Sequence, residues 1–162
     1  MPRTDPVPYN FSVEELLNPQ SGSIRRFLKS WYGLAESGEN ATSSGASEIP
    51  HEIVDWHEAA ESTGVEVTFQ DYPVALANLK RSNDGMIVFW VENQNGYYWA
   101  INPDRAEREV FCREDASSAW RNTGEKLDHF LLHCTVREAI IGAESKFSAV
   151  VPTSALQDAL TG

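Results

Sequence analysis

Two groups of histidines in this sequence have spacings that resemble those of metal ligands. The first group lies in the stretch HEIVDWHE, residues 51–58. The helical zinc motif HExxH places histidines at positions i and i+4, so that both imidazoles face one metal. In this chain position i+4 is Asp55, and His51 and His57 are separated by about 600° around a helix at ~100° per residue. His51, Asp55 and Glu58 could share a face and hold a metal weakly, but the pattern is more typical of an acidic, solvated helix face.

His129 and His133 form the second group, at the i, i+4 spacing that two ligands on one helix face require, with Glu125 close in sequence. Pairs of this kind also arise by chance. Cys134 does not form a nucleophile–base pair with His133, because adjacent residues of a helix point in different directions. The chain has no Gly-rich phosphate loop and no nucleophile elbow. We therefore expect no catalytic residues, no metal and no cofactor, and a protein that is not an enzyme.

Glu92 is the remaining candidate for chemistry, in the polar segment Glu92-Asn93-Gln94-Asn95-Gly96 between two apolar runs. One hypothesis makes Glu92 a general base with a raised pKa. A second hypothesis has Glu92, Asn93 and Gln94 fix the loop by hydrogen bonds from side chain to backbone, because an isolated carboxylate among aromatic rings is costly to bury. A third has the segment contact a protein partner. We favour the structural hypothesis, followed by partner contact.

The elements on either side of this segment are predicted to be the strands of a β-hairpin, at residues 86–91 and 97–101. Asn95-Gly96 is the pair preferred in a two-residue type I′ turn, which would place Glu92 opposite Trp99. Residues 86–91 show no alternation of polar side chains, so we expect this strand to be covered on both faces. Trp99 and the polar segment are thus expected to be structural residues of the hairpin.

The remaining elements are predicted from periodicity, capping residues and prolines. Two helices are expected near the start of the chain, at 11–17 with a Ser12–Glu15 capping box and at 24–35 after Ser23 as N-cap. Further helices are expected at 50–61, 73–80 and 126–141 and after Pro152. Strands are expected at 65–69 and 109–113. Successive strands have no helical crossover between them, which predicts an α+β fold with a central antiparallel sheet packed by helices. The 162 residues fit a single domain, 1–162, with a loose arm at 1–10 and a flexible loop at 36–48.

The charge of the chain bears on its partners. The net charge is −11, and residues 50–101 carry eight acids against two bases. Phosphate contacts need Lys and Arg, so we expect no direct nucleic-acid partner, whereas a basic protein would be attracted. Acidity alone also keeps a protein soluble. We expect no membrane partner and a cytoplasmic location, because there is no long apolar run or secretion signal and Cys112 and Cys134 are predicted to be reduced thiols.

Three stretches of the chain resemble a known family. They are IPHEIVDWHEAA, in which Ile-Pro opens a helix that bears a Trp; DGMIVFWVENQNGYYWAINPD, the predicted hairpin; and Trp120 followed by LDHFLLHCTVREA. In this order they are similar to the first helix, the central hairpin and the last helix of the SUKH superfamily, also known as the Smi/Knr-type domain. The resemblance covers about residues 50–142.

This resemblance implies an α+β fold with a central antiparallel sheet and no catalytic residues. Bacterial members are mostly immunity proteins that bind and neutralise polymorphic toxins, often nucleases, and fungal members are scaffolds in cell-wall signalling. A nuclease tends to be basic in the groove where it binds phosphate, and an acidic face of this protein could occupy that groove. We expect the partner to be bound by acids of the middle third and by exposed tyrosines, namely Glu52, Asp55, Glu58, Glu61, Glu66, Asp71 and Tyr72, with Tyr97 or Tyr98.

The acids and the hairpin are also compatible with three alternatives. A solvated surface would account for the acids without any partner. A regulatory or scaffold module of the same fold would bind a cellular protein without inhibiting a toxin. A small enzyme that uses Glu92 or a histidine-centred metal site is the third alternative.

Overall fold

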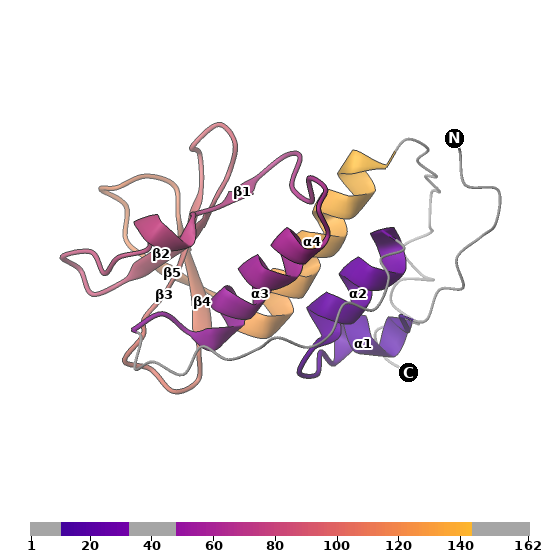
Figure 1. Ribbon diagram of the computed structural model, residues 1–162. Coiled ribbons are helices and arrows are strands. Elements are labelled where there is room, and N and C mark those ends of the chain that lie inside the picture. The colour runs from indigo at the N-terminus through magenta and orange to yellow at the C-terminus, as the bar shows by residue number, and fades with distance from the viewer. Residues whose placement is uncertain (1–10, 33–47, 144–162) are drawn as a thin grey trace, which may run out of the picture.

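Helices occupy one side of the structure and a β-sheet the other (Figure 1). The computed structural model describes residues 11–32 and 48–143. In this part of the chain α1 (Val13–Leu17) and α2 (Ser23–Tyr32) lie outside α3 (His51–Ser62) and α4 (Leu127–Gly142), which pack on the sheet. The arrangement confirms the predicted fold class, α+β with a central antiparallel sheet packed by helices.

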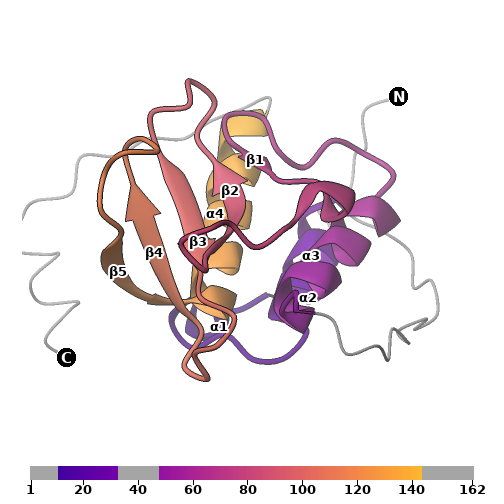
Figure 2. The same ribbon diagram turned by 90° about the vertical axis from the view of Figure 1, so that its left-hand side faces the viewer.

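The sheet of the described residues has five strands, each antiparallel to the next strand in the chain and beside it (Figure 2). They are β1 (Tyr72–Pro73), β2 (Ile87–Val91), β3 (Tyr98–Ile101), β4 (Glu109–Arg113) and β5 (Arg121–Lys126), and the short 3₁₀ helix η1 (Leu76–Asn78) precedes β2. The predicted pairing of the two apolar runs is confirmed by β2 and β3. The sequence does not predict β5, because RNTGEK has no apolar residue; it is an edge strand that pairs through its backbone with β4.

Aromatic side chains fill the space between β2 and the two inner helices. Five of the six residues 86–91 are buried, which confirms that this strand is covered on both faces. Trp90 meets the ring of Trp56 on α3 edge to face with centroids 5.3 Å apart, and Phe89 meets Phe130 of α4 in the same way at 5.5 Å. Because each helix contacts β2 through such a pair, the position of the hairpin relative to α3 and α4 is fixed by the core.

The turn between β2 and β3 is longer than predicted. Glu92 N–H donates to the carbonyl oxygen of Tyr97 at 2.9 Å, which leaves residues 93–96 as a four-residue loop, and Asn95 N–H donates to the carbonyl oxygen of Glu92 at 2.8 Å. Asn95 has a φ of +58°, but Gly96 does not have the positive φ that a type I′ turn needs at both central residues. The predicted two-residue turn is therefore wrong. The predicted register is wrong too, because Trp99 lies opposite Trp90 and not opposite Glu92.

The segment between α3 and β1 is irregular, so the predicted strand at 65–69 is wrong. Val65, Val67 and Phe69 alternate with polar residues as in a strand, but of these three side chains only Val67 is buried. Backbone N–H groups near the end of the segment bond a carboxylate of α4 and not a neighbouring strand. We call residues 63–72 the strap.

Smaller predictions about caps and short helices had mixed outcomes. The capping box is confirmed, because Ser12 Oγ accepts from Glu15 N–H at 3.2 Å at the start of α1. Ser23 is not an N-cap: it lies inside α2, and its Oγ accepts from Gln20 N–H at 2.9 Å. The helix predicted at 73–80 is reduced to η1.

Some predictions fall on parts of the chain that are not described. They are the arm at 1–10, residues 36–47 of the loop, and the C-terminal helix after Pro152. Among the helices of residues 11–32 and 48–143, none combines the length and the apolar character needed to cross a membrane.

Candidate functional site

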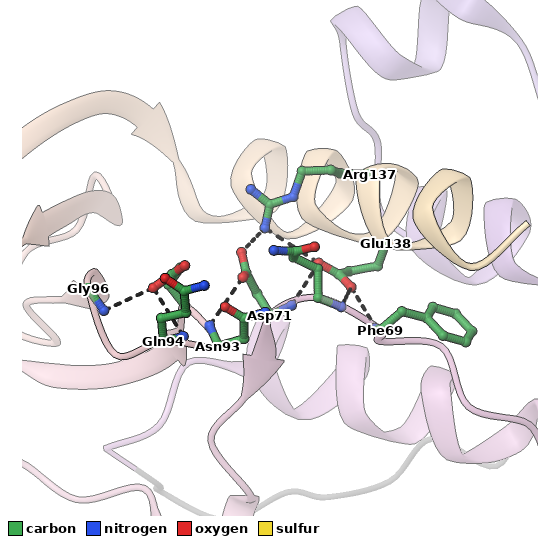
Figure 3. A network of polar contacts seen from close by, with 9 residues as sticks. Phe69, Asp71, Asn93, Gln94, Gly96, Arg137 and Glu138 are labelled. Atoms are coloured by element: carbon green, nitrogen blue, oxygen red, sulfur yellow. Dashed lines mark hydrogen bonds and ion pairs between the residues drawn. The ribbon is translucent and has the colours of Figure 1, made fainter. Parts of the chain in front are cut away.

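A buried carboxylate near the end of α4 holds the strap in place. Glu138 is completely buried. Its two oxygens accept hydrogen bonds from three consecutive backbone N–H groups, those of Phe69 at 2.6 Å, Gln70 at 2.7 Å and Asp71 at 3.1 Å (Figure 3). Charge-assisted bonds of this kind offset the loss of hydration of a buried anion. Glu138 thereby fixes the strap against α4.

Asp71 extends this network to the hairpin. Its side chain is only 3% exposed and forms an ion pair with Arg137 of α4. It also accepts a hydrogen bond from the backbone N–H of Asn93 at 3.3 Å, and Arg137 lies 3.5 Å from Glu138 as well (Figure 3). The sequence predicts Asp71 to bind a partner as one of the surface acids. The structure instead places its carboxylate inside the molecule, where it joins the strap, α4 and the hairpin loop.

Glu92 turns its carboxylate onto its own loop. Oε2 accepts hydrogen bonds from the N–H groups of Gln94 at 3.2 Å and Gly96 at 2.9 Å (Figure 3). A Cβ atom at position 96 would lie 3.1 Å from this oxygen, so the glycine makes room for the carboxylate. These bonds account for the longer turn, because a four-residue loop brings two backbone donors to one oxygen. The arrangement is that of a loop-stabilising side chain.

The hairpin loop presents polar side chains beside a tyrosine. Asn93, Gln94 and Asn95 are exposed, and the Tyr72 hydroxyl donates to Asn95 Oδ1 at 3.0 Å. Trp99 lies in β3 and packs on Phe130 with centroids 5.7 Å apart. The structure thus brings Tyr72 and the loop residues together, with the amide groups on the outside.

Groups of the protein itself donate hydrogen bonds to all three carboxylates of this network. Glu92, Asp71 and Glu138 each accept backbone hydrogen bonds, and these bonds hold the hairpin loop and the strap. A cavity of about 190 Å³ lies elsewhere, at the start of α3, and is lined by Glu48, Ile49, Pro50, Arg81, Pro103, Asp104 and Arg108. None of the predicted site residues lines it, and its two arginines form ion pairs with Asp104 and Glu52.

One histidine of each pair lies against a neighbouring carboxylate. His133 Nδ1 lies 2.8 Å from a Glu125 oxygen and Nε2 lies 3.1 Å from the carbonyl oxygen of Leu16 in α1. His51 Nδ1 lies 3.4 Å from a Glu52 oxygen. In residues 11–32 and 48–143 no group of three or more His, Cys, Asp or Glu side chains is placed to hold a metal ion.

Four of the predicted acids form an acidic surface on α3 and the first part of the strap. Asp55, Glu58 and Glu61 follow one another at three-residue intervals on α3, and Glu66 lies just beyond its end. Among the described residues, no ion pair or side-chain hydrogen bond engages these four carboxylates. Glu52 differs, because it is paired with Arg108 at 2.8 Å. We call Asp55, Glu58, Glu61 and Glu66 the open acids.

The stretch of sequence that carries the open acids has no strongly basic residue. Residues 51–79 contain no Lys and no Arg, although α2, which carries Arg25, Arg26 and Lys29, packs on α3. Elsewhere acids are matched by nearby arginines, as in the pairs Glu114–Arg121 and Glu15–Arg26. The open acids therefore form a run of negative charge that no Lys or Arg interrupts along the chain.

Arg137 and Glu138 are the site residues that sequence reasoning missed. Glu138 lies on the apolar side of α4, seven residues after Leu131 and four residues after Cys134. A carboxylate at such a position must find internal partners, because isolated burial is unfavourable. That position is the signal that could have identified Glu138. Its partners lie 67 to 69 residues earlier in the chain, and nothing in the sequence indicates them.

Comparison of this chain with known proteins found no similar protein. No family model, no curated protein and no solved structure matches this chain.

Proposed function

We propose that this protein is a non-catalytic binding domain of the immunity type, which neutralises a basic toxin domain, for instance a nuclease, by direct contact. The single observation that carries the proposal is the set of open acids, which no side chain of the described residues neutralises. The resemblance of residues 50–142 to the SUKH superfamily supports the same class of function. The use of Glu92, Asp71 and Glu138 in holding loops supports a binding function over catalysis.

The position of the open acids is unfavourable for the helix that carries them. Asp55, Glu58 and Glu61 are like charges at i, i+3 spacing, which destabilises a helix. Glu61 also lies in the last turn, at the negative end of the helix dipole, where α3 has no basic residue. Residues that reduce stability in this way are expected where function requires them. A partner with a basic surface would remove the repulsion and be drawn to the site over a distance.

The proposal expects a toxin domain to be encoded beside this gene, and the experiment is its inhibition by this chain, assayed with purified proteins. We expect one equivalent of the chain to abolish toxin activity. Glu58→Gln/Glu61→Gln should weaken binding by roughly tenfold or more, as expected for charges at a complementary interface. The control is Glu14→Gln/Glu107→Gln, which removes the same charge from two exposed acids on other segments and should change binding less than about threefold. A toxin domain that stays fully active in the presence of excess chain would contradict the proposal.

A further inference from the structure

Exposed apolar side chains gather on the strap. Seven large apolar side chains of the described residues are exposed, and three of them lie within eight residues of one another: Val65 at 53%, Phe69 at 46% and Tyr72 at 42%. The strap runs from the end of α3, past the end of α4, to the edge of the sheet (Figure 1). Apolar side chains scattered singly are common on any protein surface, but a row of them on one segment is typical of an interaction surface.

The strap is held firmly at both of its ends. Thr63 Oγ1 donates to the carbonyl oxygen of Ala60 at 2.7 Å and accepts from Val65 N–H at 3.2 Å. At the other end Glu138 holds three consecutive N–H groups, and Asp71 is buried against Arg137. A segment that is already ordered loses little conformational entropy when a partner binds. The exposed side chains of the strap are therefore presented by a pre-organised backbone.

The ring of Phe69 packs against Gly142 in the last turn of α4. A Cβ atom built at Gly142 would lie 2.2 Å from the Phe69 ring, so the ring occupies the space that any other residue at position 142 would fill. One side of the ring therefore packs on the last turn of the helix, while 46% of the residue remains exposed. A large aromatic side chain that is partly packed and partly exposed is the usual form of an interface anchor.

Negative charge lies beside the first part of the strap. Glu66 is on the strap itself, and Glu61 precedes it on α3. Neither α3 nor α4 has a basic residue in its last turn to compensate the negative end of its helix dipole, and Arg137, which precedes the last turn of α4, is paired with the buried Asp71. A partner segment that places an apolar side chain here would bind more tightly if basic residues flanked that side chain. An acidic segment would be repelled.

We propose that the strap is the apolar anchor of the interface and that its occupant is a segment of the basic partner in which Lys or Arg residues flank an apolar side chain. The apolar side chain of the partner segment contacts Val65, Phe69 and Tyr72. Its flanking Lys or Arg residues pair with Glu61 and Glu66. The proposal rests on the proposed function and adds to it where on this chain the partner is held.

The test is the affinity of the neighbouring toxin domain for strap variants, measured by calorimetry. Phe69→Ser should raise Kd tenfold or more, in the range of an interface anchor. Leu17→Ser is the matched control, because Leu17 is an apolar residue on α1 that is 65% exposed, and its Kd should stay within about twofold. Gly142→Ala is a second variant, which removes no surface group and displaces the Phe69 ring from its packing position against residue 142. This variant should also raise Kd.

The outcomes separate the two proposals. If Phe69→Ser and Gly142→Ala, each folded by circular dichroism, bind as tightly as the unmodified chain while Glu58→Gln/Glu61→Gln binds weakly, the strap is not the anchor and the proposed function stands. If the unmodified chain does not bind the toxin domain, both proposals fail.

Discussion

At the scale of single residues, the acids of this protein fall into two groups with different roles. Glu138, Asp71 and Glu92 accept backbone hydrogen bonds and hold the strap and the hairpin loop in place. The open acids, by contrast, make no ion pair in the described part of the chain. The first group serves stability and the second does not, so substitutions should separate the two roles.

Replacing Glu138 tests the structural role. Glu138→Ala would leave three N–H groups of the strap without their acceptor, one of them buried and two partly buried, and an unsatisfied buried donor costs about 1–3 kcal/mol. We expect the free energy of unfolding, measured with urea, to fall by about 3–5 kcal/mol. Glu61→Gln on the open surface is the control and should change it by less than about 0.5 kcal/mol. Equal values for the two variants would show that Glu138 does not fix the strap.

Asp84 provides a prediction about pH. Hydrogen bonds from the side chains of Ser82 and Trp120, then the bond from the backbone N–H of Met86, and last the charge of Arg113, lower the pKa of Asp84 from 3.8 to about 2. A carboxyl whose pKa is lower in the folded state contributes stability above its unfolded pKa and loses it as the pH falls. The side chain is 40% exposed, so we expect a contribution of only about 1 kcal/mol at pH 7.

The measurement compares Asp84→Asn with the unmodified chain by urea unfolding at several pH values. The difference should be constant above about pH 5 and should shrink as the pH falls from 3.8 towards 2. Asp55→Asn, which removes an exposed acid that has no ion pair in the described residues, is the control for the loss of one negative charge. A difference between Asp84→Asn and the unmodified chain that persists at pH 2 would contradict the assigned cause.

At the scale of elements, the hairpin shows how far local sequence can predict structure. The apolar runs predict β2 and β3 and their antiparallel pairing, because a buried strand needs a continuous apolar stretch. The predicted turn is too short, because the Asn95-Gly96 pair favours two residues while the Glu92 carboxylate stabilises four. Local propensity is overruled by a hydrogen bond that depends on the loop already being formed.

The strap and β5 could not be predicted for a different reason. The alternation of Val65, Val67 and Phe69 predicts a strand, but the N–H of Phe69 is taken by Glu138, far away in sequence. In β5 the pairing is through the backbone of an edge strand, which needs no apolar residue. Of the site, the open acids are predicted from their charge and spacing. The burial of Asp71 and the role of Arg137 depend on tertiary contacts and could not be predicted.

Asn95 allows the turn to be tested. Its φ of +58° is tolerated by Asn and Gly but unfavourable for a β-branched residue. Asn95→Val should lower the free energy of unfolding by about 1–2 kcal/mol, whereas Asn95→Gly should change it by less than about 0.5 kcal/mol, although both lose the bond to Tyr72. Thermal unfolding of the two variants gives the comparison. Similar losses for Val and Gly would attribute the effect to the Tyr72 bond and not to the backbone.

At the scale of the whole molecule, charge is distributed unevenly over a rigid fold. The net charge is −11, and the stretch 51–79, which includes α3 and the strap, has no Lys and no Arg. Sheet and core give this stretch a fixed shape, since α3 is packed on β2 through Trp56 and Trp90. This acidic surface with apolar side chains at one end is the feature from which we propose a basic protein partner, since contacts to nucleic-acid phosphates need Lys and Arg.

The most direct test of a binding function carried by the open acids is the salt dependence of binding to the neighbouring toxin domain. We compare the unmodified chain with a variant in which all four open acids are neutralised, Asp55→Asn, Glu58→Gln, Glu61→Gln and Glu66→Gln, after confirming that its stability is not reduced. We predict that Kd of the unmodified chain rises steeply between about 50 and 500 mM salt, and that the variant binds roughly a hundredfold more weakly at low salt with a shallower dependence. Equal Kd values and equal salt dependence for the two chains would contradict a role of the open acids in binding.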